Sequence, residues 1–352
     1  MEHTKSTNTN VTIKDVARTA GVSIATVSRI LNGSAGVSEE LAARVNAAVD
    51  MLEYRPNAVA RALKERKSRS IGLVIPDIEN PFFPSLVRGA EDAARQQGYA
   101  VILCNTDGNA VEEDRYIQFL FSKQVDGILF IGGIESQGNL EMLADLPVPV
   151  VTLDRRAATG KLSAVVYDNY QGAILAVEHL IKTGRKKIAF ISGPLKSSSS
   201  IDRRRGFTDT LAKFSLPVNE KLTFVGNYSF DSGYQAIKEL IEKKESFDAI
   251  FAANDMMAIG AIEALLEASI RVPEDVAIVG FDDIRLAFWH KPSLTTVRQP
   301  AYEMGQAAVA MLIKQMSSTS AEVLEHKFLP ELIVRKSTEN QGAEHEPKTI
   351  RE

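Results

Sequence analysis

The sequence contains one cysteine, one tryptophan and no long uninterrupted apolar run. A single cysteine cannot form an internal disulfide, and its place in the apolar run AVILC at residues 100–104 predicts that Cys104 is a buried core thiol. No apolar stretch approaches the ~20 residues that a membrane helix needs. The polar N-terminus MEHTKSTNTN also lacks the apolar segment of a secretory signal. We therefore expect a cytoplasmic protein with a disordered leader at residues 1–10.

The signatures of common enzyme classes are missing as well. The glycine-containing segment GIESQG at residues 133–138 continues with Asn139, whereas a phosphate-binding Walker loop continues with Lys and Ser or Thr. The five histidines form no metal-ligand cluster, and there is no nucleotide fingerprint. We expect a protein that is not an enzyme and that carries no cofactor and no catalytic metal.

The length and the uneven charge indicate several domains. A chain of 352 residues is too long for one ordinary core and suggests two or three domains. The net charge is −4, but residues 1–70 carry 11 Lys and Arg against 7 Asp and Glu, and the remainder carries 30 against 38. A basic head on an acidic body suits a protein that presents one end to phosphate.

Residues 11–56 are predicted to form three short helices in a helix-turn-helix arrangement. Thr12 and Asp15 fit a capping box at the start of the first helix, and Gly21 can supply the positive φ of a tight turn. Ser23 is a good N-cap for a second helix at residues 24 to about 32, and the segment Ser38-Glu39-Glu40 is expected to begin the third.

In such a motif the second helix enters the major groove. Ala17, Val27 and Ile30 are expected to pin that helix from inside. Arg29 can bond a guanine edge, and Ile24 and Ala25 can touch thymine methyls. Phosphate contacts are expected from four polar side chains, which position the protein without reading bases: Lys14, Ser23, Thr26 and Ser28. The alternative is a small three-helix bundle without a DNA role.

From residue 71 onward the pattern becomes α/β. Seven apolar runs alternate with amphipathic stretches, as expected for buried parallel strands in βαβ units. The runs are IGLVI, AVILC, GILFI, VVTL, KIAFIS, AIFAA and VAIVGF. The region divides into two similar halves near Asp168, which predicts two doubly wound lobes with a cleft between them. Tyr167 to Asn169 and Arg298 to Pro300 are the expected crossings.

The segment TIKDVARTAGVSIATVSRILNG, followed by YRPNAVARALK, resembles the lactose-repressor (LacI/GalR) family, and the resemblance continues to about residue 338. It implies an all-α helix-turn-helix head plus a hinge helix, joined to an α/β two-lobed effector domain like the periplasmic binding proteins. The implied boundaries are a hinge helix and linker at 57–69, an effector and dimerisation domain at 70–338, and a flexible tail at 339–352. Lobe 1 would comprise about 70–167 and 300–325, and lobe 2 about 168–299 and 326–338.

The resemblance also assigns DNA contacts to the hinge. Family members use the segment corresponding to residues 57–64 as a hinge helix, so Asn57, Leu63 and Lys64 are expected at the DNA, with Leu63 wedged into the minor groove. An isolated helix this short is marginal in water. It should order only when a dimer partner and DNA supply contacts. The alternative for Leu63 is an ordinary packing residue on an amphipathic linker.

The body is most similar to ribose-binding proteins and ribose operon repressors. The resemblance implies aromatic walls around a sugar, with an amide and charged side chains on its hydroxyls, which suits a ligand with apolar faces and polar edges. The implied effector-binding residues are Asn80, Phe82, Phe83, Asp154, Arg155, Arg203, Phe230, Asn254, Asp282 and Gln299. The effector is expected to be D-ribose, a related pentose or its phosphate.

The resulting hypothesis is a homodimeric repressor of a sugar-utilisation operon, bound to a pseudo-palindromic double-stranded operator and released by the sugar. Some family members use corepressors instead, so the sign of the coupling stays open. One alternative is a catabolite-control regulator that acts with a phosphorylated carrier protein. A sugar-transport protein is disfavoured by the DNA-binding head. The tail shows no leucine heptads, so a tetramerising coil is not expected.

Overall fold

The computed structural model describes residues 11–31, 37–55, 67–132, 137–154, 161–317 and 322–339. The chain separates into two compact units, residues 1–68 and 69–352. The expected leader, the hinge segment 57–64 and the tail beyond residue 339 lie outside the described residues. No helix in the described ranges is long and apolar enough to cross a bilayer.

The first unit contains three short helices, α1 (Ile13–Ala20), α2 (Ile24–Leu31) and α3 (Glu39–Met51). They enclose a small core of six buried residues, Val16, Ala17, Ala20, Val27, Val45 and Ala48. The start of α1 is closed by the expected capping box, because Asp15 Oδ2 accepts the Thr12 backbone N–H at 3.0 Å. Ser38 caps α3 by accepting the N–H of Leu41. The predicted helix starts are thus confirmed.

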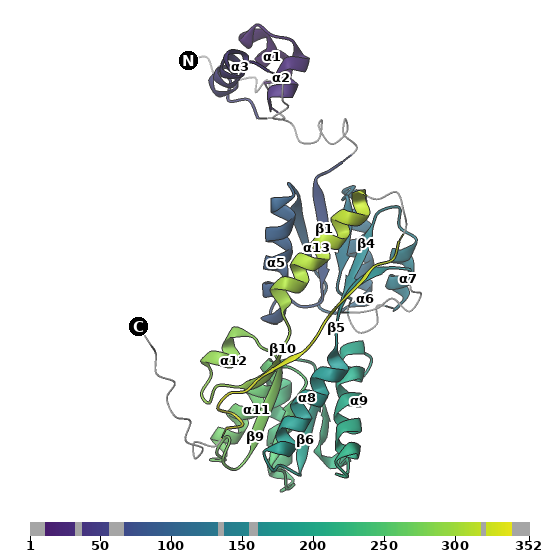
Figure 1. The fold of residues 1–352 in the computed structure, drawn as a ribbon, viewed down its shortest axis with the longest axis vertical. Coiled ribbons are helices and arrows are strands. Elements are labelled where there is room, and N and C mark those ends of the chain that lie inside the picture. The colour runs from purple at the N-terminus through teal and green to yellow at the C-terminus, as the bar shows by residue number, and fades with distance from the viewer. Residues whose placement is uncertain are drawn as a thin grey trace, which may run out of the picture. The chain divides into compact units, whose positions relative to one another are not determined.

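The second unit consists of two lobes, each built on a six-stranded sheet with helices on both faces (Figure 1). The lobe 1 sheet has the order β11-β5-β4-β3-β1-β2, and the lobe 2 sheet has the order β12-β10-β9-β8-β6-β7. All paired strands are parallel except β10 and β12. The expected pair of doubly wound lobes is confirmed.

Most of lobe 1 comes from the first part of the body. Its elements are β1 (Ser70–Ile75), α5 (Phe82–Gln96), β2 (Ala100–Asn105), α6 (Ala110–Ser122), β3 (Gly127–Phe130), α7 (Gln137–Ala144), β4 (Val150–Leu153), β5 (Ser163–Tyr167), α13 (Ala301–Ser317) and β11 (Glu325–Phe328). Helices α5 and α13 pack so closely that a Cβ on Gly89 would lie 2.0 Å from the carbonyl oxygen of Tyr302. Cys104 is buried as predicted, and burial raises the pKa of its thiol to about 11.

Lobe 2 is formed by the middle of the chain and one late strand. Its elements are α8 (Asn169–Lys182), β6 (Ile188–Ser192), α9 (Ser198–Lys213), a 3-10 turn η1 (Glu220–Leu222), β7 (Thr223–Val225), α10 (Phe230–Glu242), β8 (Ala249–Ala252), α11 (Asp255–Glu267), β9 (Ala277–Asp282), α12 (Arg285–Trp289), β10 (Thr295–Arg298) and β12 (Glu331–Ile333). The seven apolar runs of the sequence correspond to β1, β2, β3, β4, β6, β8 and β9.

The described chain crosses between the lobes after β5, after β10 and after β11 (Figure 1). The first two crossings are the predicted ones. The third lies after Phe328, because β11 still pairs with β5, so lobe 1 extends past the expected boundary at residue 325. The crossings are tied together: Tyr167 Oη donates to the Arg298 carbonyl at 2.7 Å, and Lys327 Nζ lies 2.5 Å from Asp168 Oδ2.

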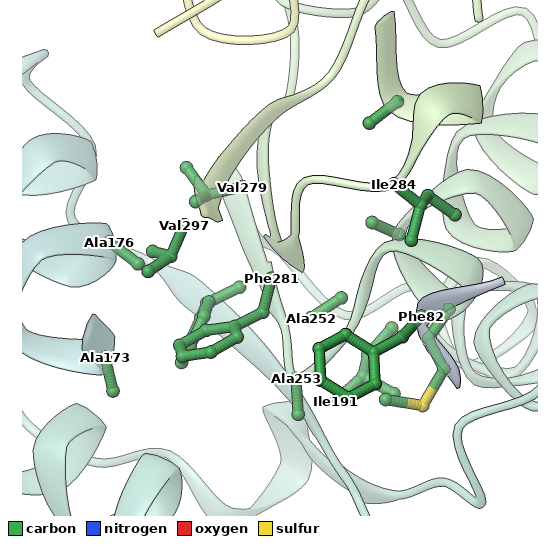
Figure 2. Packing of buried hydrophobic residues seen from close by; sticks show 14 of the residues in the cluster. Phe82, Ala173, Ala176, Ile191, Ala252, Ala253, Val279, Phe281, Ile284 and Val297 are labelled. Carbon is green, nitrogen blue, oxygen red and sulfur yellow. The ribbon is translucent and has the colours of Figure 1, made fainter. Parts of the chain in front are cut away.

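The side chain of Phe82 is part of a core cluster that contains residues of both lobes. Phe82 begins α5 in lobe 1, yet it is 7% exposed and is part of a cluster that includes Phe281, Ala253 and Ile284 of lobe 2 (Figure 2). Burial of an aromatic ring across the two lobes stabilises their contact. The fold thus places β-strand carboxyl ends of both sheets next to each other at the interlobe cleft.

Candidate DNA-reading and effector-binding sites

The turn between α1 and α2 is built from local backbone geometry. Gly21 ends α1 with φ 63°, a left-handed conformation that glycine adopts without the strain of a side chain. Ser23 Oγ accepts the N–H of Thr26 at 3.1 Å, so Ser23 is the N-cap of α2 as predicted. Arg44 of α3 donates to the carbonyl of Ala20 at 2.7 Å and braces the turn, a contact that the sequence analysis missed.

One side of α2 is buried and the other faces solvent. Val27 is fully buried in the three-helix core, while Ala25 and Arg29 are exposed. Ile24 is 44% exposed although it is a large apolar residue at the start of the helix. Ile24 in the first turn and Arg29 in the last turn of α2 are therefore both exposed, and side chains of these two kinds can contact base edges in the major groove.

The expected phosphate contacts lie around this face. Lys14 and Ser23 are exposed, and Thr26 and Ser28 are half-buried. Ser23 Oγ and Thr26 Oγ1 share a hydrogen bond of 2.9 Å in addition to the cap. Both hydroxyls are therefore already engaged within the helix start. The expected contacts Asn57, Leu63 and Lys64 lie outside the described residues.

A cavity of about 480 Å³ lies between the two lobes of the body. Its walls come from loops that follow strands of both sheets, the edge where open α/β sheets bind ligands. Eight of the expected effector-binding residues line this cavity: Asn80, Phe82, Phe83, Asp154, Arg203, Asn254, Asp282 and Gln299. Phe82 also belongs to the interlobe core. Arg155 lies outside the described residues.

The expectation for Phe230 is not met. Phe230 begins α10, does not line the cavity, and stacks on Tyr234 with ring centroids 6.3 Å apart. The aromatic residue on this wall is Tyr228, two positions earlier. Tyr228 has φ 68°, and Asn254 Nδ2 donates to its carbonyl at 2.9 Å. The loop before α10 therefore turns Tyr228 inward, while Phe230 follows the helix surface, a difference in loop geometry that no periodic pattern reports.

A chain of polar contacts runs across the floor of the cavity. Asn169 Nδ2 donates to Asp154 Oδ1 at 3.2 Å, and Asn169 Oδ1 accepts from Arg203 Nε at 2.8 Å. The Arg203 guanidinium lies 3.9 Å from Asp282 Oδ1, which accepts from Gln299 Nε2 at 2.6 Å. Gln299 Oε1 is buried and has no protein partner within the described residues. A buried acceptor of this kind is suited to a ligand hydroxyl.

Burial controls the charge of this floor. Arg203 is 3% exposed, donates from Nη1 to the carbonyl of Ala253, and lies 3.7 Å from the centroid of the Phe281 ring. Burial raises the pKa of Asp282 to about 7, although Arg203 and Gln299 favour its charged form. Asp255, beneath it, accepts from Thr296 Oγ1 at 2.5 Å and from the Ile284 N–H. Its burial raises the pKa of that carboxyl as well.

Two of the expected amides also shape their own loops. Asn80 Oδ1 accepts the N–H of Phe82 at 3.1 Å, and Asn254 Oδ1 caps α11 by accepting the N–H of Met257 at 3.0 Å. Four cavity residues other than glycine have positive φ: Asp107, Asp154, Tyr228 and Asp282. Backbone strain of this kind concentrates at ligand-binding positions.

Several lining residues were not anticipated from the sequence. Ser197 and Ser199 at the start of α9 are buried, and their hydroxyls lie 2.9 Å from each other and 3.4 and 3.3 Å from Tyr228 Oη. Asp77, Glu79 and Asp107 line the lobe 1 side of the cavity. A serine run before a helix signals only a cap, and acids in loops signal only a solvated surface. In the described ranges, no cluster of side chains could hold a metal ion.

These two sites define a class of protein: a small helix-turn-helix head joined to a two-lobed body with a ligand-sized cleft. Residues 12–57 match the family described as bacterial regulatory proteins, lacI family, and residues 68–331 match the periplasmic binding proteins and sugar binding domain of LacI family. The chain belongs to the LacI family of bacterial regulators. Members of that family are DNA-binding regulators and not enzymes.

Relatives cover nearly the whole chain. Catabolite control protein A of Priestia megaterium is 40% identical over 89% of this chain and 95% of its own length. The ribose operon repressor of Escherichia coli K12 is 36% identical over 93% of this chain and 99% of its own length. The solved lac repressor dimer bound to operator and the anti-inducer ONPF has a TM-score of 0.85, with 29% identity over 93% of this chain and 99% of that one.

Proposed function

We propose that this LacI-family regulator represses a sugar-utilisation operon and that ribose, or a closely related pentose, relieves the repression by binding between the lobes. The observation that carries the proposal is the cavity floor, where Asp154, Asn169, Arg203, Asp282 and Gln299 form one polar chain. Phe83 and Tyr228 add aromatic surface to the same cavity. Aromatic faces with planar, charged hydrogen-bonding groups match the faces and edges of a sugar ring.

The position of the cavity links ligand binding to the lobes. Asp154 and Arg203 belong to different lobes, and Gln299 lies in the second crossing between them. A ligand that bonds all three favours the arrangement in which the lobes are closed. Binding at one site can then change affinity at another only if the ligand prefers one of the two arrangements. We infer that closure lowers operator affinity, with the segment at residues 57–64 as the connection.

The active form in this proposal is a homodimer on a pseudo-palindromic operator. The solved lac repressor bound to operator is a dimer, and a two-fold protein matches two half-sites. Helix α12 carries an apolar surface that suits a second copy of the chain, with Phe288 62% and Trp289 60% exposed and Leu286 beside them. Exposed aromatic clusters of this kind are typical of interfaces.

A gel-shift titration of the full-length protein on its operator tests the proposal. Ribose should weaken operator binding of the wild type, and the isosteric variant Asp282→Asn should bind the same operator without responding to ribose. Arg29→Ala serves as the matched control, because it should bind the operator more weakly and still bind ribose in calorimetry. Operator binding that ribose tightens or leaves unchanged would refute the induction mechanism.

The second candidate is a catabolite-control regulator that acts with a phosphorylated carrier protein. The 40% identity with catabolite control protein A favours it. The two candidates differ in what changes operator affinity. If the phosphorylated carrier protein tightens operator binding while ribose neither binds nor acts, this second function replaces the first.

A further inference from the structure

The charge of the cavity lining is strongly unbalanced. Among the lining residues that the structure describes there are five carboxylates and a single base, Arg203. The carboxylates are Asp77, Glu79, Asp107, Asp154 and Asp282. Even if the expected Arg155 joined them, acids would outnumber bases. A cleft lined mainly by one sign of charge repels ligands of the same sign.

Three of these acids form the lobe 1 rim and are held in place by a network between two loops. Asp77 Oδ1 accepts the N–H of Glu79 at 2.8 Å in the connection after β1. Asn105, at the end of β2, accepts the N–H of Ile78 at 2.8 Å and donates to Asp107 Oδ1 at 2.6 Å. The two loops are therefore joined through Asn105, which holds the backbone around Glu79 and the carboxylates of Asp77 and Asp107 on the same side of the cavity.

Arg203, the single base among the described lining residues, already has partners within the protein. Arg203 Nε donates to Asn169, its Nη1 donates to the Ala253 carbonyl, and its guanidinium lies against both Phe281 and Asp282. A phosphate monoester needs donors or cations that are not neutralised by neighbouring carboxylates. Arg203 instead offers a fixed, charge-balanced edge that suits a hydroxyl.

The N-terminus of α9 is the feature that could favour an anion, because helix N-termini bind phosphates. Ser197 and Ser199 lie there, but their hydroxyls are bonded to each other and to Tyr228 Oη. Hydroxyls donate and accept at once, as a ligand hydroxyl does, whereas a phosphate dianion only accepts. This cluster therefore complements the polyol edge of an uncharged sugar.

From these contacts we propose that the cavity selects the uncharged sugar and rejects its phosphate ester, and that Asp77, Glu79 and Asp107 impose the selection. The inference rests on the proposed function, since it names the class of effector that the same cleft takes. The three carboxylates lie on the rim, where salt screens their repulsion. The selection should therefore weaken as ionic strength rises.

Calorimetry of the full-length protein with D-ribose and with ribose 5-phosphate tests the proposal. The wild type should bind ribose at least about tenfold more tightly than the phosphate at low salt. Raising the ionic strength from about 0.05 M to about 0.3 M should strengthen phosphate binding several-fold and leave ribose binding unchanged. This salt series needs no variant, so it decides the question even if a variant fails to fold.

The triple variant Asp77→Asn, Glu79→Gln, Asp107→Asn locates the effect. It should bind ribose within about threefold of the wild type and gain about tenfold in affinity for ribose 5-phosphate. The matched control neutralises three exposed lobe 1 acids outside the cavity lining, as Asp114→Asn, Glu141→Gln, Asp145→Asn. It makes the same change in net charge and should leave both affinities unchanged.

The outcomes separate this inference from the proposed function. If the wild type binds ribose 5-phosphate as tightly as ribose, or if the rim variant gains no phosphate affinity, the inference is wrong and the sugar-responsive function stands. If the control variant gains as much as the rim variant, the overall charge acts and the rim does not. If the wild type binds neither compound, the proposed function and the inference fall together.

Discussion

The head and the effector cavity place their functional side chains in opposite environments. In the head, Ile24, Ala25 and Arg29 project from a surface whose support is the buried Val27. In the cavity, Arg203, Asn254, Asp282 and Gln299 are all buried, and several are bonded to one another. The expected DNA-reading residues of the head are separate from its core, whereas the expected effector-binding residues of the cavity also take part in packing.

Because of this difference, substitutions in the head and in the cavity should change different measured properties. Removal of an exposed base-reading side chain changes affinity for DNA and leaves the core intact, because surface changes outside caps and turns have small effects on stability. Removal of a buried, hydrogen-bonded ion leaves its partners unsatisfied in a low-dielectric interior. Effector-site variants should therefore combine loss of response with loss of stability.

Arg203→Ala should give the largest effect. It removes the cation beside Asp282 and the donor to the Ala253 carbonyl, so the free energy of unfolding should fall by about 3–5 kcal/mol. The response to ribose should be lost at the same time. Thermal unfolding and the gel shift with and without ribose measure the two effects. Arg203→Lys is the control, because it keeps the positive charge but replaces the planar guanidinium with an ammonium group. Wild-type stability together with a wild-type ribose response would contradict the shared role.

Arg29→Ala should show the opposite pattern in the head. Loss of an exposed guanidinium that reads a guanine edge should weaken operator binding by about 1–3 kcal/mol, or roughly fivefold to 150-fold. The unfolding midpoint and the affinity for ribose should stay unchanged, since Arg29 is exposed. Fluorescence anisotropy on the operator and on a scrambled duplex separates base reading from phosphate contact. An equal loss on both duplexes would show that Arg29 positions the protein and reads no base.

The contrast also explains which strands could be predicted. Six of the seven apolar runs became buried strands, since a strand covered on both faces must be apolar throughout. The seventh, β2, lies at the sheet edge, and only Cys104 in it is buried. Strand β5 (Ser163–Tyr167) was missed although it is buried throughout. Strands β10 and β11 were missed because Thr295–Arg298 is polar in sequence and Glu325–Phe328 lies at a sheet edge with three exposed residues. Strand β12 has only three residues, too few for any periodic pattern. Pairing with a neighbouring strand creates these elements, and the local sequence does not encode it.

In the cavity, the residues that follow apolar strands were predictable by position. Asp154 and Asp282 come at the carboxyl ends of β4 and β9, where ligand groups are expected. Tyr228 was missed in favour of Phe230, because the direction of a side chain in a loop depends on φ, and Tyr228 has the positive value. The rim acids and the Ser197–Ser199 pair become meaningful only when two loops, or a helix start and a loop, are brought together.

Asp282 allows the cavity to be tested through pH. Burial raises the pKa of its carboxyl from 3.8 to about 7, so the folded protein binds this proton more tightly than the unfolded chain. Its stabilising contribution is therefore complete below about pH 4, falls as the pH rises, and is lost above about pH 7. Compared with wild type, Asp282→Asn should become relatively more stable across this window, by up to about 1.4 kcal/mol per pH unit. Urea unfolding of both proteins at about pH 5, 6, 7 and 8 measures this difference, and a pH-independent difference would contradict the raised pKa.

Substitutions of Ser23, the N-cap of α2, should have the smallest effect on stability. Ser23 was expected both to cap α2 and to contact phosphate, and its hydroxyl accepts the N–H of Thr26 and shares a hydrogen bond with the Thr26 hydroxyl. Ser23→Ala should therefore lower the stability of the head by about 1 kcal/mol. Ser23→Asp separates the two roles, since Asp caps a helix as well as Ser does but repels phosphate. Wild-type unfolding with weakened operator binding would place Ser23 at the DNA backbone. Wild-type unfolding together with wild-type operator binding in Ser23→Asp would show that Ser23 acts as a cap alone and makes no phosphate contact.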